Sequence, residues 1–442
     1  MVAPPPAREG WLYLIMAVIL AGAPIVLFYR DPITYAHLIA EDFAGEYATA
    51  AAFAAAGLLF FVDAAPAPAR GRKAIGLILG LLAVVIAGEE VSWGERVLHN
   101  LFGIGVPDSI RAVNLQGELN LHNLEGVGLN RAYRPLSYLL LGWLALSALL
   151  FAVRPALAAR LSATGVPVVP RRLVPVCVLP PFFFLLAPIA KSDEIGELLV
   201  GVAALSFALD RAWSSGWVAR PQLLTRPTAL VVSLVAVGLL ALGLAAFSPL
   251  GRMAWRLHTL AERDYPMYGM FEPAEEIFDY IYSHPSELEA QDTRLTHAEV
   301  LAAAGRLPEA RRMLAVAEEK LDRDAVAASG DILRRIGTLY AILGEGIRAE
   351  ELLAAAVAAD QRSLEMAAGA DERAQLLLSL ARTLVAQGLP VEAATTAATG
   401  HRTAVSASTR HEIERWLSEL EDQRSAAPSD VQRLAPPPSA DS

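Results

Sequence analysis

The sequence predicts an all-α protein in two parts, a polytopic membrane helix bundle followed by a soluble helical array. The chain is 54% hydrophobic and only 19% charged, with a mean hydropathy of +0.39, which is too apolar for an ordinary soluble protein. The apolar excess lies before residue 250, and amphipathic patterns and charge follow it. We expect a transmembrane domain at 1–250, a soluble helical domain at 251–424 and a disordered Pro/Ser/Ala-rich tail at 425–442.

The overall composition excludes several kinds of function. The net charge is −10 and no basic cluster is present, so no nucleic-acid partner is expected. Cys177 is the one cysteine, which rules out an intramolecular disulfide and a cysteine-based metal site. The first apolar run, 11–29, is long enough to span a bilayer and lacks a small-residue cleavage site, so we interpret it as an uncleaved anchor.

About seven apolar segments approach the length of a membrane span. They cover 11–29, 43–62, 74–93, 135–153, 173–190, 195–213 and 228–247. The fifth contains Pro175, Pro180, Pro181 and Pro188. Because proline removes a backbone donor and clashes with the preceding turn, we expect this segment to be kinked or broken.

Lysine and arginine in the short loops predict the orientation, because cytoplasmic loops carry the excess of these residues. They are enriched before the first segment and after the second, fourth and sixth segments. These basic residues are Arg8, Arg70, Arg72, Lys73, Arg154, Arg160, Arg171, Arg172, Arg211, Arg220 and Arg226. The N-terminus is therefore expected in the cytoplasm, and an odd number of spans places the C-terminal domain outside. The Ala- and Arg-rich composition is typical of a GC-rich bacterium, so we expect the inner membrane, with the C-terminal domain in the periplasm.

Acidic residues lie mostly at the opposite, outer ends of the same segments. The outer set is Glu41, Asp42, Glu46, Glu89, Glu90, Glu95, Glu118, Glu125, Asp193, Glu194 and Glu197, whereas Glu9, Asp63 and Asp210 fall on the inner side. Ionisable groups at membrane depth are costly, so they are a functional hypothesis by default. The predicted orientation of the spans, together with the acids at their outer ends, thus predicts a polar site at the periplasmic face.

Helical spacing groups these side chains further. Asp42/Glu46, Glu118/His122 and Asp193/Glu197 are each four residues apart, which puts each pair on one helix face. Helix bundles build carboxylate–histidine metal sites in this way. The predicted ligands of a divalent metal are Glu41, Asp42, Glu46, Glu89, Glu118, His122, Asp193 and Glu197. Oxygen ligands with one imidazole suit Mg²⁺, Ca²⁺, Mn²⁺ or iron, or Zn²⁺ if the histidine binds.

The same region offers candidates for catalysis and also a purely structural alternative. Glu89, Glu90, Glu118 and His122 are the candidate catalytic residues, because a carboxyl that keeps its proton among other acids can act as a general acid or base. In the alternative, the acids are solvated or form packing pairs, such as Glu118 with Arg111.

The C-terminal part contains a weak repeat: LAAAGRLPEA at 301–310, YAILGEGIRA at 340–349 and LVAQGLPVEA at 384–393. In each copy a glycine precedes an alanine by five residues, at Gly305/Ala310, Gly344/Ala349 and Gly388/Ala393. A glycine that ends one helix, followed by a small residue where the next helix packs, resembles the hairpin of tetratricopeptide repeats. The spacings of 39 and 44 exceed the usual 34 residues of that repeat, and an unrelated antiparallel bundle is the alternative.

The membrane part also resembles a known family. GEEVSWGERVL at 88–98 and the N-x-Q-x-E-x-N-L-H-N stretch at 114–123 are similar to motifs of a bacterial family of polytopic membrane proteins that has no assigned activity. That family tends to show E-D-G-x-x-E at its second span, where Phe43 here replaces the glycine, and Glu95 replaces its usual glutamine in the first motif. The resemblance covers about residues 35–200 and implies that the acids belong together.

Two weaker similarities point to lipid chemistry. Glu90, Trp93 and Glu95 resemble the acidic W-x-E motif of the alkaline ceramidase-like superfamily, but the three zinc-binding histidines of that superfamily have no counterparts. Glu41-Asp42 is placed like the acidic pair of membrane-embedded, lipid-linked glycosyltransferases, although their large external loops are missing.

Three functions follow as expectations. The first is a metal-dependent site that acts on a membrane lipid or lipid-linked substrate, with the repeats recruiting a periplasmic protein partner. The second is a non-enzymatic scaffold or assembly factor. The third is proton- or cation-coupled transport. The sequence leaves open whether the protein is an enzyme.

Overall fold

The computed structural model describes residues 7–40, 43–67, 70–92, 133–215, 225–246, 248–290, 292–321 and 329–426. Within these ranges every regular element is a helix, so the predicted all-α class is confirmed. The chain divides into two compact units, Met1–Glu289 and Ala290–Ser442. The predicted boundary lay at 250/251, and the structure groups residues 251–289 with the first unit.

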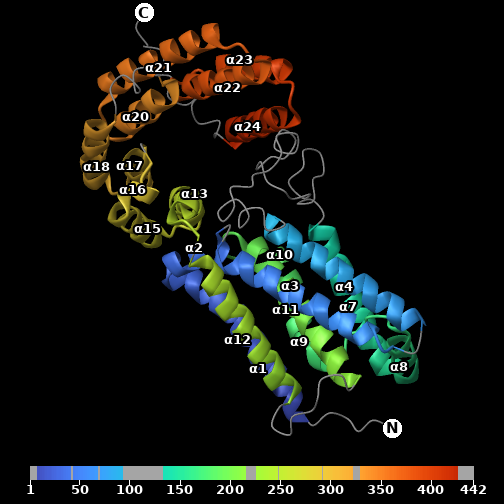
Figure 1. Cartoon of the computed structure of the whole chain (residues 1–442). Helices are drawn as coiled ribbons and strands as arrows, with labels where there is room; N and C mark the ends of the chain where they lie inside the picture. Colours follow the sequence, from blue (N-terminus) through green and yellow to red (C-terminus); the bar gives the residue numbers. More distant parts are fainter. Residues whose placement is uncertain are drawn as a thin grey trace, which may run out of the picture. The chain divides into compact units, whose positions relative to one another are not determined.

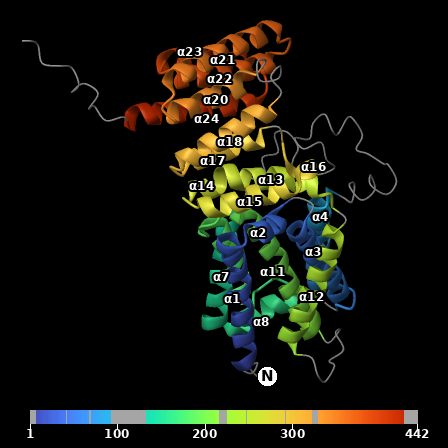
Figure 2. The same ribbon diagram turned by 90° about the vertical axis from the view of Figure 1, so that its left-hand side faces the viewer.

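The first unit consists of long helices that run roughly parallel and short helices that cross one of their ends (Figures 1 and 2). Its helices are α1 (Ala7–Arg30), α2 (Pro32–Ile39), α3 (Ala44–Ala64), α4 (Arg70–Glu90), α7 (Tyr133–Val153), α8 (Pro155–Thr164), α9 (Val174–Cys177), α10 (Leu179–Leu185), α11 (Ser192–Ser214), α12 (Arg226–Ala245), α13 (Ala254–Thr259), α14 (Tyr265–Met267), α15 (Phe271–Ser283) and α16 (Pro285–Leu288). Single 3₁₀ turns at Arg171–Leu173 and Leu250–Met253 and a π-helical turn at Leu260–Asp264 complete it.

Four of these helices are long and apolar enough to cross a membrane, which indicates a membrane protein. They are Gly10–Arg30, Ala44–Ala64, Arg70–Glu90 and Arg226–Ala245, and they coincide with four of the seven predicted segments. The segment at 173–190 is broken into α9 and α10, as its prolines predict. The segment at 195–213 forms one helix, α11, which carries four acids and an arginine and is not among these four apolar helices. Seven spans therefore stay a prediction.

Helix α3 is the centre of the bundle, because it packs against α4 on one side and α11 on another. Small residues allow these close approaches. A Cβ added to Gly76 of α4 would come within 2.8 Å of the Ala64 Cβ, and one on Gly201 of α11 within 3.2 Å of the Ala52 Cβ. Lipid provides no hydrophobic drive for helices to associate, so such close backbone contact stabilises membrane bundles.

The short helices at residues 251–289 join the first unit through an aromatic cluster. Tyr265 stacks on Phe28 near the end of α1, with ring centroids 4.9 Å apart, and donates a hydrogen bond to the Phe28 carbonyl at 3.0 Å. Tyr35 packs against the edge of Phe28 and donates to the Ala190 carbonyl. Burial of these rings removes large apolar surfaces from water and ties α1, α2 and α14 together.

The second unit is a row of antiparallel helices (Figure 1). Its helices are α17 (Thr293–Ala303), α18 (Leu307–Lys320), α20 (Gly330–Ile342), α21 (Gly346–Met366), α22 (Ala370–Ala386), α23 (Pro390–Thr403) and α24 (Ala407–Ala426). The pairs α17/α18, α20/α21 and α22/α23 are in close contact. The tail predicted from residue 425 lies, except for its first two residues, outside the described ranges.

The turns of these three pairs have the geometry that the repeat pattern predicts. Gly305, Gly344 and Gly388 have φ angles of 75°, 82° and 80°, which favour glycine because it lacks a Cβ. In the first turn the amide of Arg306 bonds to the Leu301 carbonyl and the amide of Gly305 to that of Ala302, which is a Schellman cap. The helical-hairpin prediction is confirmed, whereas kinship with tetratricopeptide repeats stays a prediction.

Candidate functional site

Five carboxylates from three helices meet at one end of the bundle. They come from the first turn of α3, the first two turns of α11 and the last turn of α4, and α3 packs against both neighbours. We call this set the acidic end: Glu46, Glu89, Glu90, Glu194 and Glu197. Each is partly buried. The charges of Glu197, Glu46, Glu194 and Glu89 all act on Glu90, and that of Glu197 acts most strongly.

Helix electrostatics distinguish the members of the acidic end. Glu46 and Glu194 lie in the first turns of their helices, where the partial positive charge of the helix N-terminus favours an anion. Glu89 and Glu90 are the last two residues of α4, where the helix end is itself negative. The helix dipole therefore disfavours the charged form of these two carboxyls, in contrast to Glu46 and Glu194.

One arginine from the short helices reaches the acidic end. Arg256 of α13 donates from Nη2 to Oε1 of Glu194 at 2.9 Å, and its side chain is only 3% exposed. Asp193, the neighbouring predicted ligand, is exposed. Burial raises the pKa of Tyr35, and the charges of Tyr265, Asp193 and Glu194 raise it further, which places the start of α11 beside α2.

At the opposite end of the bundle, which we call the arginine end, the described acids Asp63 and Asp210 pair with arginines. Arg72 donates to Oδ1 of Asp63 at 2.5 Å, and Arg211 donates to Oδ2 at 2.9 Å. Asp210 pairs in the same way with Arg172 at 2.5 Å and with Arg226 at 3.8 Å. Because the Asp63 side chain is completely buried and held from α4 and α11, this end is a structural clamp.

The predicted metal ligands are only partly within the described residues. Glu41, Asp42, Glu118 and His122 lie outside them, so four of the eight predicted ligands have no described position. In the ranges that are described, no three His, Cys, Asp or Glu side chains form a group that could hold a metal ion. The acidic end is therefore a cluster of interacting charges, and the metal centre stays a prediction.

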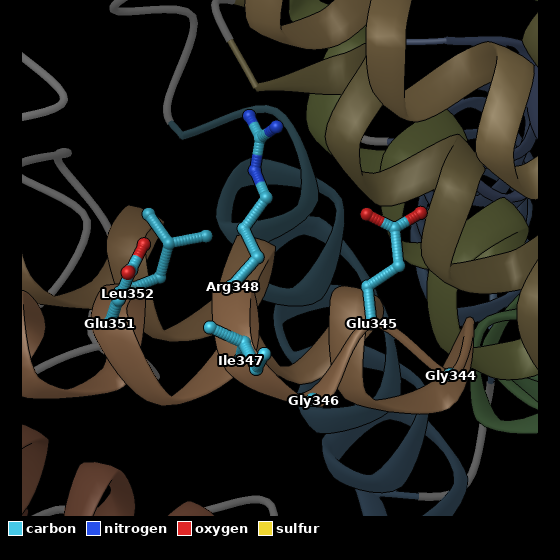
Figure 3. A pocket seen from close by; sticks show the side chains of 7 residues that line it. All are labelled: Gly344, Glu345, Gly346, Ile347, Arg348, Glu351 and Leu352. Carbon is cyan, nitrogen blue, oxygen red and sulfur yellow. The ribbon is translucent and has the colours of Figure 1, made fainter.

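A second candidate is an open depression at the turn between α20 and α21. Its lining residues are Gly344, Glu345, Gly346, Ile347, Arg348, Glu351 and Leu352. Figure 3 shows the Glu345 and Arg348 side chains rising on the same side of the ribbon. Glu345 pairs with Arg311 at 3.2 Å and Arg348 with Glu318 at 3.0 Å, while Ile347 is 80% exposed. The charges at this depression are thus paired within the array, next to an exposed apolar side chain.

Sequence reasoning placed Glu194 among the outer acids but not among the predicted ligands, and it did not single out Arg256. Glu194 lies between the paired positions Asp193 and Glu197, so helical spacing gave it no partner. Arg256 follows the last apolar segment, and nothing local marks it as buried. Its role depends on a contact 62 residues away along the chain.

Comparisons with known proteins add no further constraint, because no family model, no curated protein and no solved structure matches the chain.

Proposed function

We propose that this is an integral membrane protein whose acidic end binds a divalent cation and acts on a lipid or lipid-linked substrate. The supporting observation is the group of five carboxylates from α3, α4 and α11, four of which act on the fifth, Glu90. Repulsion among carboxylates is relieved by protons or cations, and oxygen donors suit hard divalent ions. In this proposal Glu89 and Glu90, with the sequence-predicted Glu118 and His122, supply the acid–base groups.

The proposed orientation places the acidic end at the periplasmic face of a bacterial inner membrane. It rests on the arginine end, where Arg72, Arg172, Arg211 and Arg226 gather beside Asp63 and Asp210. Cytoplasmic ends of spans are enriched in such residues. A reporter that is active only in the periplasm, fused after Glu289, is expected to be active. Activity of a cytoplasm-only reporter at this position would contradict the orientation.

Metal analysis of the purified full-length protein tests the cation site. After equilibration with Mg²⁺, Mn²⁺, Ca²⁺ or Zn²⁺ and removal of free ion, elemental analysis is expected to find bound metal in the wild type. Glu90→Gln and Glu197→Gln should lose it, because each removes one interacting charge without changing side-chain size. Glu272→Gln, an exposed acid of α15, is the control that should retain it. Wild-type protein without metal would refute the site.

A non-enzymatic scaffold is the second candidate, and the helical array favours it. Ile347, Met366 and Val391 are 80%, 78% and 59% exposed, which leaves apolar side chains available to a protein partner. Removal of residues 290–442 keeps the first unit complete. If the scaffold function is right, this deletion abolishes the cellular phenotype, whereas Glu90→Gln leaves it unchanged. If the acidic end is the active part, the substitution alone abolishes the phenotype.

Transport is the weakest of the three proposals. In the described residues of α3, α4 and α11, the polar groups between the two ends include Thr49 and Ser206. Both hydroxyls donate back to carbonyls of their own helices, at 2.9 Å and 2.7 Å. Side chains that are satisfied in this way offer no continuous polar path between the acidic end and the arginine end.

A further inference from the structure

The layer of short helices α13 to α15, residues 254–283, is fixed to two of the helices that can cross a membrane. Its chain leaves α12 at Ala245, and α13 begins soon afterwards at Ala254. In the last turn of α1, the Phe28 ring stacks on Tyr265 of the layer. Helices α13 and α15 also pack against α2, which follows α1 (Figure 2). Because both spans end at this layer, it lies at the level of the membrane surface.

Apolar side chains are uncovered at this level, and we call them the apolar rim. Tyr268, which follows α14, packs edge-on against Phe28 of α1, with ring centroids 5.5 Å apart. The neighbouring Tyr29 hydroxyl donates to the Pro188 carbonyl at 3.3 Å, which brings the segment before α11 to the same level. The apolar rim consists of Tyr29, Leu186, Trp255, Met267 and Tyr268, which are 43%, 73%, 61%, 70% and 40% exposed.

The apolar rim continues a surface that faces lipid. On α1 the side chains of Ile15, Ile19 and Val26 are 54%, 62% and 58% exposed, and a spanning helix presents such side chains to the acyl chains. Tyr29 lies at the end of the same helix, about one turn after Val26. Tryptophan and tyrosine concentrate where a protein crosses from lipid to water, because one part of each ring is apolar and the other polar. The rim therefore has the composition of a membrane interface.

Exposed charge distinguishes the rest of the layer from the apolar rim. Helix α15 exposes the acids Glu272, Glu276 and Asp279, which favour water. A surface with an apolar part and a strongly charged part is typical of helices that lie in the membrane interface. Next to the rim, Lys191 and Asp193 carry charges of opposite sign, so apolar contact with lipid is the interaction that the rim offers.

We propose that the layer α13 to α15 rests in the headgroup region of the bilayer, with the apolar rim inserted among the first methylenes of the lipids. Interfacial helices place their apolar side chains about 5–10 Å into the boundary between headgroups and acyl chains. Arg256 follows Trp255 and binds Glu194, so the acidic end lies at the level of the lipid headgroups. This placement rests on α1 and α12 as spans, and it does not depend on cation binding at the acidic end.

Depth-dependent fluorescence quenching in vesicles tests this placement. Met267→Cys, in a Cys177→Ala background, is labelled with an environment-sensitive fluorophore, and the full-length protein is reconstituted into phosphatidylcholine vesicles. The emission is expected to shift to the blue. Lipids with a spin label near the headgroup should quench it more strongly than aqueous iodide does. Leu239→Cys of α12, 66% exposed at that position, reports the span itself and should respond to spin labels deeper in the bilayer. Circular dichroism checks that the variants stay folded.

Two further labelled variants are the controls. Glu272→Cys lies on the charged helix α15, and Val405→Cys replaces a side chain of the array that is 69% exposed, close to the 70% of Met267. Both probes should be quenched by iodide and little by lipid. If the Met267 probe is quenched by lipid no more than these controls, while the Leu239 probe is quenched, the spans stand and the proposal fails. A disulfide-linked dimer of Met267→Cys would show that a second copy covers the rim and would also overturn it.

Discussion

The two ends of the bundle should respond in opposite ways to the loss of one negative charge. Asp63→Asn removes a charge that is completely buried and that pairs with Arg72 and Arg211, whose side chains are 26% and 10% exposed. The substitution leaves two largely buried guanidinium groups without a counter-charge. Removing one partner of such a network costs about 3 kcal/mol of unfolding free energy, at the lower limit for buried pairs because Arg72 is partly solvated.

Glu90→Gln makes the same change in charge at the acidic end, where four other carboxylates act on Glu90. Removing one of several like charges relieves repulsion, so the unfolding free energy should stay the same or rise by about 1 kcal/mol in metal-free buffer. A divalent cation that binds the folded state should stabilise the wild type in proportion to the logarithm of its concentration. It should have little effect on Glu90→Gln.

The assay is unfolding of the detergent-solubilised protein by increasing SDS, followed by circular dichroism with and without the cation. A loss of stability in Glu90→Gln as large as that in Asp63→Asn would refute the reasoning. It would mean that the acidic end, like the arginine end, consists of structural pairs. Unchanged stability in Asp63→Asn would refute the clamp.

Two further predictions concern the helical array. Arg335 of α20 is held by Asp292 and by Glu299 of α17, both at 2.6 Å, and these carboxylates are 43% and 32% exposed. Because water solvates them when the arginine is lost, Arg335→Met should lower the unfolding free energy by about 1.5 kcal/mol. Denaturant unfolding measures this loss beside an exposed control, Arg362→Met. Burial lowers the pKa of His297 to about 4 from its ordinary 6.5. The unfolded chain then binds a proton that the folded chain does not, so stability is present above pH 6.5 and falls as the pH drops towards 4, by up to about 3 kcal/mol. Unfolding at several pH values should show this dependence in the wild type but not in His297→Gln, and equal slopes would contradict it.

The sequence and the structure agree most closely where local rules apply. Hydropathy and segment length located the four helices that can cross a membrane, because each crossing requires a continuous apolar run. The glycines at 305, 344 and 388 located the turns of the array, because each holds a positive φ angle that other residues rarely adopt. The polar site that acids at the ends of the spans predict stays a prediction.

Other features depend on contacts between distant segments, and no local pattern encodes them. The Arg211 side chain reaches Asp63 across 148 positions of sequence, and Tyr265 reaches the Phe28 carbonyl across 237. The first contact turns the acids of the arginine end into a clamp. The second makes residues 251–289 part of the membrane unit, although their amphipathic pattern predicts the start of the array.

The sequence by itself therefore determined the helical class, the apolar helices, the glycine turns and the existence of acids at the ends of the spans. Only the tertiary structure decided which of those charges meet. Glu90 interacts with Glu46 and Glu197 because α3 packs between α4 and α11. Glu194 meets Arg256 because α13 crosses the end of the bundle. The physical reason is that hydropathy and turn preference act on neighbouring residues, whereas charge pairing is set by how helices pack in space.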